Sequence, residues 1–107
     1  MKKINEYENI IIIDSLLKDQ EIQETIKQCE LFLLSHKVEI INKEDWGLRK
    51  LAFKIKNRHN GYYYIFRYKT NSINIEIINK INNKNDKIIR SMIIKLDKNA
   101  INFYNKK

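Results

Sequence analysis

The stretch that decides the fold of this chain reads EDWGLRKLAFKIK (residues 44–56), NRHNG (57–61) and YYYIFRYK (62–69). Two strand-like runs flank a short polar loop that ends in Gly61, and this order predicts a long β-hairpin. Both arms of the hairpin combine basic with aromatic side chains. That mixture suits an RNA ligand better than a small-molecule substrate.

The residues before the hairpin predict one strand and one helix. Residues 5–14 contain the unbroken apolar run Ile10–Ile13, which is typical of a central strand with both faces partly covered. From about residue 18 to residue 36 the pattern becomes helical. Its apolar stripe consists of Ile22, Ile26, Cys29 and Leu33. A second strand should begin at residues 38–41, and Trp46-Gly47 interrupts it, which predicts a bulge or bend at Gly47.

The residues after the hairpin predict a second helix and a last strand. Asn71 and Ser72 form a typical helix N-cap. The apolar stripe of this helix consists of Ile73, Ile77, Ile78 and Ile81. Residues 82–86 are typical of a loop, and a strand follows from about residue 87 to residue 96. Residues 97–107 show no firm pattern, and we expect them to form a loosely held basic tail.

The resulting element order is β-α-β-β-α-β, and two βαβ units of this kind fold as a ferredoxin-like split sandwich of the α+β class. Right-handed crossovers place both helices on one face of a four-stranded antiparallel sheet. The first and third strands are then central, which agrees with their apolar character. The length of 107 residues fits one domain, predicted to span residues 1–96.

Charge is sorted along the chain. Residues 1–46 hold 10 acidic and 6 basic residues, whereas residues 47–107 hold 3 acidic and 15 basic residues, for a formal net charge of +8. A compositional bias towards lysine would not separate the two signs in this way. The basic second half indicates a polyanionic partner, and the alternative is a merely solubilising lysine surface.

Composition and spacing argue against several classes of site. The single cysteine, Cys29, permits no intrachain disulfide and favours a reducing compartment. No apolar run reaches the roughly 18 residues that span a bilayer, so we expect a cytosolic protein or one imported into an organelle. His36 and His59 have no Cys, Asp or Glu at metal-ligand spacing, and Cys29 lies on an apolar stripe. We therefore expect no catalytic residue, no metal site and no cofactor.

The second arm of the hairpin permits two interpretations. Residues 61–65 superficially resemble the signature of the RNA-recognition motif, which would make Tyr62 and Tyr64 stacking platforms for bases. Asn60, however, replaces the basic residue of that signature. In the interpretation that we favour, alternate residues face the helices as core, namely Tyr62, Tyr64, Phe66 and Tyr68. The opposite and wetter face then carries Tyr63, Ile65, Arg67 and Lys69.

Basic side chains concentrate on the hairpin and on the last strand. The candidate RNA-binding residues are Arg49, Lys50, Lys54, Lys56, Arg58, Arg67, Lys69, Arg90 and Lys95. Their predicted role is to neutralise phosphates, and the alternative is a solvated face.

Three segments of the chain resemble the family of bacterial-type small-subunit ribosomal protein six. EDWGLRKLAF (residues 44–53) is similar to the family pattern Gly-x-Arg-x-Leu-Ala-Tyr-Pro-Ile, although Phe53-Lys54 replaces Tyr-Pro. DKIIRSMIIK (residues 86–95) resembles the last strand of the family, and Tyr7-Glu8 before the isoleucine run resembles its opening. The resemblance covers roughly residues 4–96.

This resemblance implies a structural ribosomal protein, not an enzyme. It implies binding to the central domain of the small-subunit ribosomal RNA as a heterodimer with small-subunit ribosomal protein eighteen, without a membrane or a small-molecule substrate. Arg49 and Arg90 match basic positions of the family segments, and arginine can clamp a phosphate with two hydrogen bonds. Trp46 is the candidate contact for the partner protein, or else it folds back to close the end of the core.

Two other functions stay open at this point. One is a stand-alone module of recognition-motif type that binds single-stranded RNA. The other is a regulatory domain of ferredoxin-like fold that binds a small molecule, which the strongly basic second half disfavours.

Overall fold

The computed structural model describes residues 3–105, including the side chains of residues 3–101. Its elements in chain order are β1 (Asn5–Asp14), α1 (Asp19–Ser35), β2 (Glu39–Ile55), β3 (Arg58–Thr70), α2 (Ser72–Lys84), β4 (Ile88–Leu96) and α3 (Lys98–Asn105). The strands form one antiparallel sheet in the order β2-β3-β1-β4. The central positions predicted for the first and third strands are therefore confirmed.

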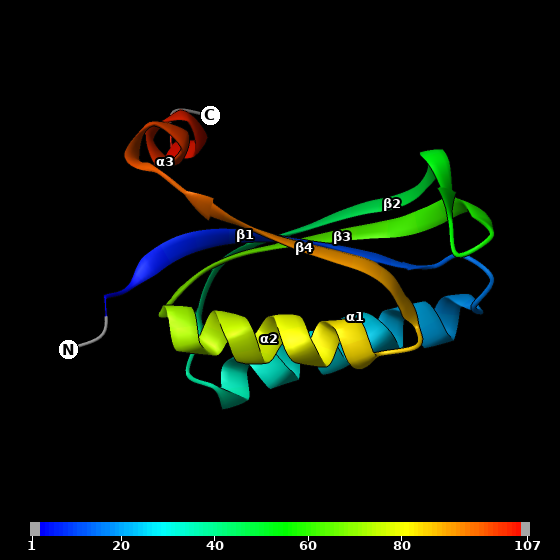
Figure 1. The fold of residues 1–107 in the computed structure, drawn as a ribbon, viewed down its shortest axis with the longest axis horizontal. Coiled ribbons are helices and arrows are strands. Elements are labelled where there is room, and N and C mark those ends of the chain that lie inside the picture. Colours follow the sequence, from blue (N-terminus) through cyan, green and yellow to red (C-terminus); the bar gives the residue numbers. More distant parts are fainter. Residues whose placement is uncertain (1–2, 106–107) are drawn as a thin grey trace.

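Helices α1 and α2 cover one face of the sheet, which we call the helical face (Figure 1). The other side, which we call the open face, carries no helix along its middle, and α3 stands on that side beyond the end of β4 (Figure 1). This arrangement is the predicted ferredoxin-like split sandwich.

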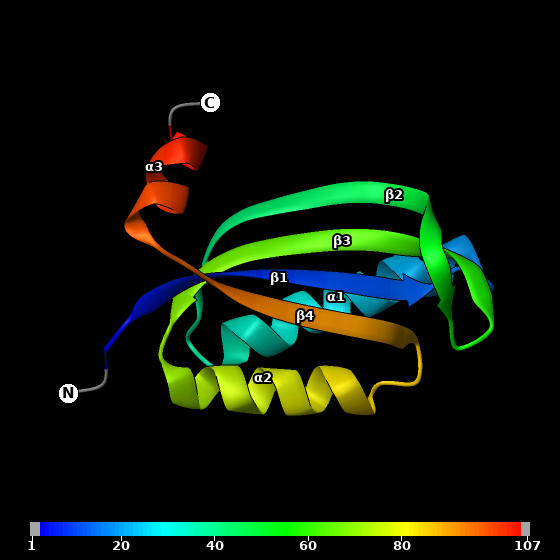
Figure 2. The same ribbon diagram turned by 45° about the horizontal axis from the view of Figure 1, so that its top comes forward.

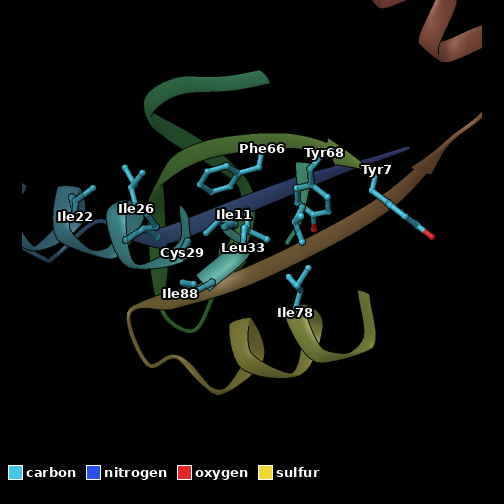
Figure 3. Packing of buried hydrophobic residues seen from close by; sticks show 12 residues of the cluster. Tyr7, Ile11, Ile22, Ile26, Cys29, Leu33, Phe66, Tyr68, Ile78 and Ile88 are labelled. Atoms are coloured by element: carbon cyan, nitrogen blue, oxygen red, sulfur yellow. The ribbon is translucent and has the colours of Figure 1, made fainter. Parts of the chain in front are cut away.

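The main core lies between the sheet and the two helices (Figure 3). Ile11 of β1 contributes to it together with Phe66 and Tyr68 of β3. The predicted stripe of α1 supplies the buried residues Ile22, Ile26, Cys29 and Leu33. Tyr62 and Tyr64 pack against the same core. Alternate residues of β3 thus face the helices, as strand geometry requires.

Helix α2 buries a different face from the one that its isoleucine stripe predicts. Ile78 is 1 % exposed, and Asn82, four residues later, is buried as well. The other residues of the predicted stripe are exposed, namely Ile73, Ile77 and Ile81. The predicted N-cap is confirmed, because the side chain of Asn71 accepts a hydrogen bond from the backbone N–H of Asn74 at 2.9 Å.

A buried polar network explains the orientation of α2. The amide of Asn9 donates to the hydroxyl of Ser91 and to the backbone carbonyl of Met92, both at 3.1 Å. The amide of Asn82 donates to Ser91 at 3.2 Å and to the side-chain oxygen of Asn9 at 3.3 Å. The hydroxyl of Tyr68 donates to the same oxygen at 3.2 Å. Buried polar groups require hydrogen-bond partners, and these groups supply them to one another. Asn82 therefore faces inward, and the isoleucine stripe faces solvent.

The tip of the β2–β3 hairpin curls over the open face. Residues 51–54 of β2 stand opposite the single residue His59 of β3, so the register breaks at this point. Leu51 thereby contacts Ile12 and Ile89 and forms a second, smaller cluster with them on the open face. The curl brings the basic tip over the adjacent ends of β1 and β4.

The C-terminal residues differ from expectation. The sequence predicts no regular element after residue 96, but Lys98–Asn105 form α3. Asp97 caps this helix, because its side chain accepts from the N–H of Ala100 at 2.8 Å and its carbonyl from the N–H of Ile101 at 3.0 Å. Eight residues are too few for a clear helical period. That the tail is loosely held stays a prediction, and residues 1–2 and 106–107 lie outside the described residues.

Candidate nucleic-acid interface

Exposed cations gather at one end of the sheet. Ile12, which contacts the hairpin tip, pairs in register with Arg90 of β4, so Arg90 lies at the same end as the tip. Together with the exposed cations of residues 49–55 of β2 and of the turn that follows it, Arg90 forms a set that we call the tip cluster. The tip cluster consists of Arg49, Lys50, Lys54, Lys56 and Arg90. Figure 2 shows the hairpin tip crossing the end of β1.

Arg58 lies at the same end but is engaged within the protein. Its guanidinium donates to both carboxylate oxygens of Asp14, at 2.8 and 3.2 Å. This hydrogen bonding lowers the pKa of Asp14 from its ordinary value of 3.8. The bidentate pair ties the hairpin tip to the end of β1, so we assign Arg58 first of all to the fold.

The expectation that the face of β3 carrying Arg67 is the more solvent-exposed one is wrong at this residue. Its side chain forms a buried ion pair with Glu6 of β1, and only 8 % of Arg67 is exposed. Ile65 on the same side is also buried. Contact with a phosphate would require the ion pair to break, which is costly for a desolvated charge. We therefore assign Arg67 to the fold rather than to the interface.

Lys69 and Lys95 are exposed, but the structure separates them from the tip cluster. They pair in register with Glu6 and Tyr7, at the opposite end of β1. They line a shallow hollow there beside α3. Of the candidate RNA-binding residues, these two would therefore contact a different part of an RNA from the one at the tip.

Trp46 lies on the open face at a bulge of β2. The register shifts between Asp45 and Gly47, and Gly47 has a φ of 73°, which confirms the predicted bulge. The indole stacks on Tyr63, with ring centroids 6.4 Å apart and planes 16° apart, and the guanidinium of Arg49 lies 5.1 Å from the indole centroid. Trp46 is 45 % exposed and does not close the end of the core. Its interpretation as a surface contact is therefore favoured.

Tyr62 and Tyr64 do not form a platform for bases. The hydroxyl of Tyr62 donates to the carboxylate of Asp45 at 2.7 Å, and the ring of Tyr64 packs on Phe66 with centroids 5.0 Å apart. Burial raises the pKa of both tyrosines. The recognition-motif interpretation therefore loses the two aromatic side chains on which it depends.

Sequence reasoning missed a group of carboxylates on the open face. Glu8 and Glu44 line a hollow beside Trp46 there. The signal was present in β1, because strand alternation places Glu6 and Glu8 on the face opposite the buried Tyr7. The open face is therefore acidic near its centre and basic at the hairpin tip.

The part of the chain that the structure describes contains no group of three or more His, Cys, Asp or Glu residues that could hold a metal ion. Within the same residues, no helix is long and apolar enough to cross a membrane. Burial raises the pKa of the Cys29 thiol to about 11, so the protonated and less reactive form predominates at neutral pH.

The family model described as ribosomal protein S6 matches residues 6–95 of the chain. Small ribosomal subunit protein bS6 of Christiangramia forsetii is 41 % identical over 98 residues, which cover 92 % of this chain and 88 % of that protein. The protein of the same name from Flavobacterium johnsoniae is 32 % identical over 100 residues, covering 94 % and 88 %.

The fold also matches a solved structure. The crystal structure of 30S ribosomal protein S6 from Thermotoga maritima superposes with a TM-score of 0.84, covering 97 % of this chain and 94 % of that chain at 21 % identity. At 21 % identity this structural match supports the fold alone, and the sequence matches establish the family. From the family model and the bacterial relatives together, we conclude that the chain belongs to the ribosomal protein S6 family.

Proposed function

We propose that this member of a family of structural ribosomal proteins binds the central domain of the small-subunit ribosomal RNA, together with small-subunit ribosomal protein eighteen. The tip cluster carries this proposal. Its five cations are exposed at one end of the sheet, and none forms an ion pair with a carboxylate in residues 3–105. Exposed cations that no carboxylate neutralises are available to neutralise phosphates and to release counterions.

The arrangement favours contacts with the RNA backbone over readout of bases. Arg49 and Arg90 come from different strands, and each guanidinium can donate two hydrogen bonds to one phosphate. The rings of Tyr62 and Tyr64 face the helices and leave no stacking platform at the recognition-motif positions. The tip cluster would thus position the protein on the RNA without specifying its sequence.

The open face supports a role for a second protein. β2 is an edge strand, and its Trp46 is exposed on the open face. Ile94 of β4 is exposed as well and pairs in register with Glu8 of β1, on the same face. An exposed edge and apolar side chains of this kind are typical of a surface that another protein covers.

Reconstitution tests the proposal. The chain, protein eighteen of the same species and an RNA fragment of the central domain are mixed at low salt and sedimented through a gradient. We expect the chain to move with the RNA when protein eighteen is present, and in a cell lysate to move with small ribosomal subunits. A chain that stays at the top of the gradient while the subunits sediment intact would refute the proposal.

A further inference from the structure

A hollow of about 80 Å³ lies on the open face, and the proposed RNA contact does not use it. It is lined by Glu8, Asn42, Glu44, Trp46, Ile65 and Arg67. These residues come from β1, β2 and β3, so the hollow spans the centre of the sheet and its β2 edge. The tip cluster lies towards the hairpin end of the sheet, and its Arg49 borders the hollow, because its guanidinium lies 5.1 Å from the indole centroid of Trp46.

The charge around this hollow is opposite to that of the whole chain. Glu8 stands opposite Arg67 in the register, and Glu44 stands opposite Ile65. Three carboxylates, those of Glu6, Glu8 and Glu44, thus lie near two guanidinium groups. One belongs to Arg67, which forms an ion pair with Glu6, and the other to Arg49, which lies 5.1 Å from the indole centroid of Trp46. The chain as a whole has a formal net charge of +8. A local excess of negative charge repels phosphates and attracts a cation.

Glu44 is held in place for such a contact. Its carboxylate accepts hydrogen bonds from the indole N–H of Trp46 at 2.9 Å and from the amide of Asn42 at 3.4 Å. These neutral donors orient the carboxylate without cancelling its charge. The stacking of Trp46 on Tyr63 fixes the indole in turn. A fixed carboxylate beside an indole is a suitable site for a guanidinium or an ammonium group.

We infer that this hollow receives an arginine or lysine side chain of a protein that docks on the open face. The inference rests on the proposed function, in which a second protein covers this face. The hollow is far smaller than the roughly 300 Å³ at which small-molecule pockets begin, and it matches the end of one long side chain. A cationic side chain enclosed by carboxylates and an aromatic ring is a frequent interface hot spot.

The surroundings of the hollow fit a protein better than an RNA. Ile10 and Met92 pair in register on the open face and are half-buried, and Ile94 beside them is exposed. A protein partner would cover these apolar side chains around its anchoring cation, which is the usual anatomy of an interface core. An RNA would instead bring phosphates close to Glu8 and Glu44.

Two variants that each remove one negative charge test this inference, namely Glu8→Gln and Glu44→Gln. Glu76→Gln on α2 is the matched control, because Glu76 is exposed on the opposite side of the molecule and its removal changes the net charge equally. The probe is purified protein eighteen of the same species, titrated by calorimetry in the absence of RNA. We expect each of the two variants to bind about tenfold more weakly, and the control to bind like the parent.

The possible outcomes separate the inference from the proposed function. If the parent binds protein eighteen and both variants bind equally well, the inference is wrong while the proposed partner stands. If the parent does not bind, the proposed partner and the inference both fall. If RNA occupies this face, Glu44→Gln raises RNA affinity above that of Glu76→Gln, which also overturns the inference. Thermal melts establish that each variant is folded. If Glu8→Gln unfolds, Glu44→Gln on the edge strand is sufficient by itself to test the inference.

Discussion

At the scale of single residues, the two glycines are required for different structural reasons. A Cβ atom on Gly61 would lie 2.4 Å from Cγ2 of Ile12 and 3.5 Å from Cδ2 of Leu51, so the missing side chain lets the hairpin tip pack on β1. A Cβ atom on Gly47 would meet no other atom within 4 Å, but the φ of +73° at this residue lies in the left-handed region. Gly61 therefore serves a close approach, and Gly47 serves a backbone conformation at the bulge.

Alanine substitutions should distinguish these two roles. Gly61→Ala should lower the free energy of unfolding by about 1–3 kcal/mol because of overpacking, and Gly47→Ala by about 1–2 kcal/mol because of backbone strain. Denaturant unfolding measures both. In the double variant Gly61→Ala/Ile12→Ala the two losses should be less than additive, because the second change removes the atom with which the new Cβ collides. Strict additivity would contradict the close approach.

At the scale of elements, the hairpin is fixed to β1 at its tip by the pair Asp14–Arg58. The backbone N–H of Asp14 also donates to the carbonyl of Lys87 at 2.9 Å, so the start of β4 is bound at the same point. This junction supports the tip cluster, because Arg49 lies on the other arm of the same hairpin and Arg90 lies on β4. The proposed RNA contact thus depends on an ion pair within the protein.

The junction should make stability depend on pH. Hydrogen bonding to Arg58 holds the pKa of Asp14 below 3.8, so the contribution is present above about pH 4 and is lost as the pH falls through the folded-state pKa. The difference in the free energy of unfolding between the parent and Asp14→Asn should therefore shrink on acidification. Urea unfolding between about pH 3 and pH 7 measures it. The variant Arg58→Gln should show the same pH dependence. If the difference in the free energy of unfolding between parent and variant does not vary with pH, this pair has no such role.

At the scale of the whole molecule, the structure sorts charge by surface as well as by position in the chain. The acidic first half places Glu6, Glu8 and Glu44 on the open face, whereas the basic second half builds the tip cluster. Membership of the S6 family, with its bacterial relatives, places the chain in the small ribosomal subunit in the cytoplasm, which is one of the two locations that the sequence left open. Two surfaces of opposite sign suit an assembly with two kinds of partner.

Salt dependence should reveal the phosphate contacts. Arg49→Ala and Arg90→Ala should each weaken binding of the complex with protein eighteen to central-domain RNA, and each should reduce the slope of log affinity against log salt by about one. Lys80→Ala, an exposed position on α2, is the matched control and should leave the slope unchanged. The measurement is a titration of the RNA at several salt concentrations. Folded variants with the affinity and slope of the parent would show that the tip cluster is only a solvated surface.

The sequence by itself determined those features that local periodicity encodes. The element order from β1 to β4, the stripe of α1, the inward face of β3 and the bulge at Gly47 all agree with expectation. In each case neighbouring residues carry the signal, because strand alternation, helical spacing and a left-handed glycine involve only a few consecutive positions. The isoleucine stripe of α2 is the exception, because most of its residues are exposed although their spacing is helical.

Only the tertiary structure decided the features whose partners lie far apart in the chain. Asn82 turns α2 inward because it bonds to Asn9, 73 residues away, and Arg67 is buried because it meets Glu6, 61 residues away. Neither pairing leaves a periodic trace in the sequence. The same holds for the hollow beside Trp46, which exists only where three strands lie side by side. Burial and charge at such points depend on which strands become neighbours, and that is a property of the folded sheet.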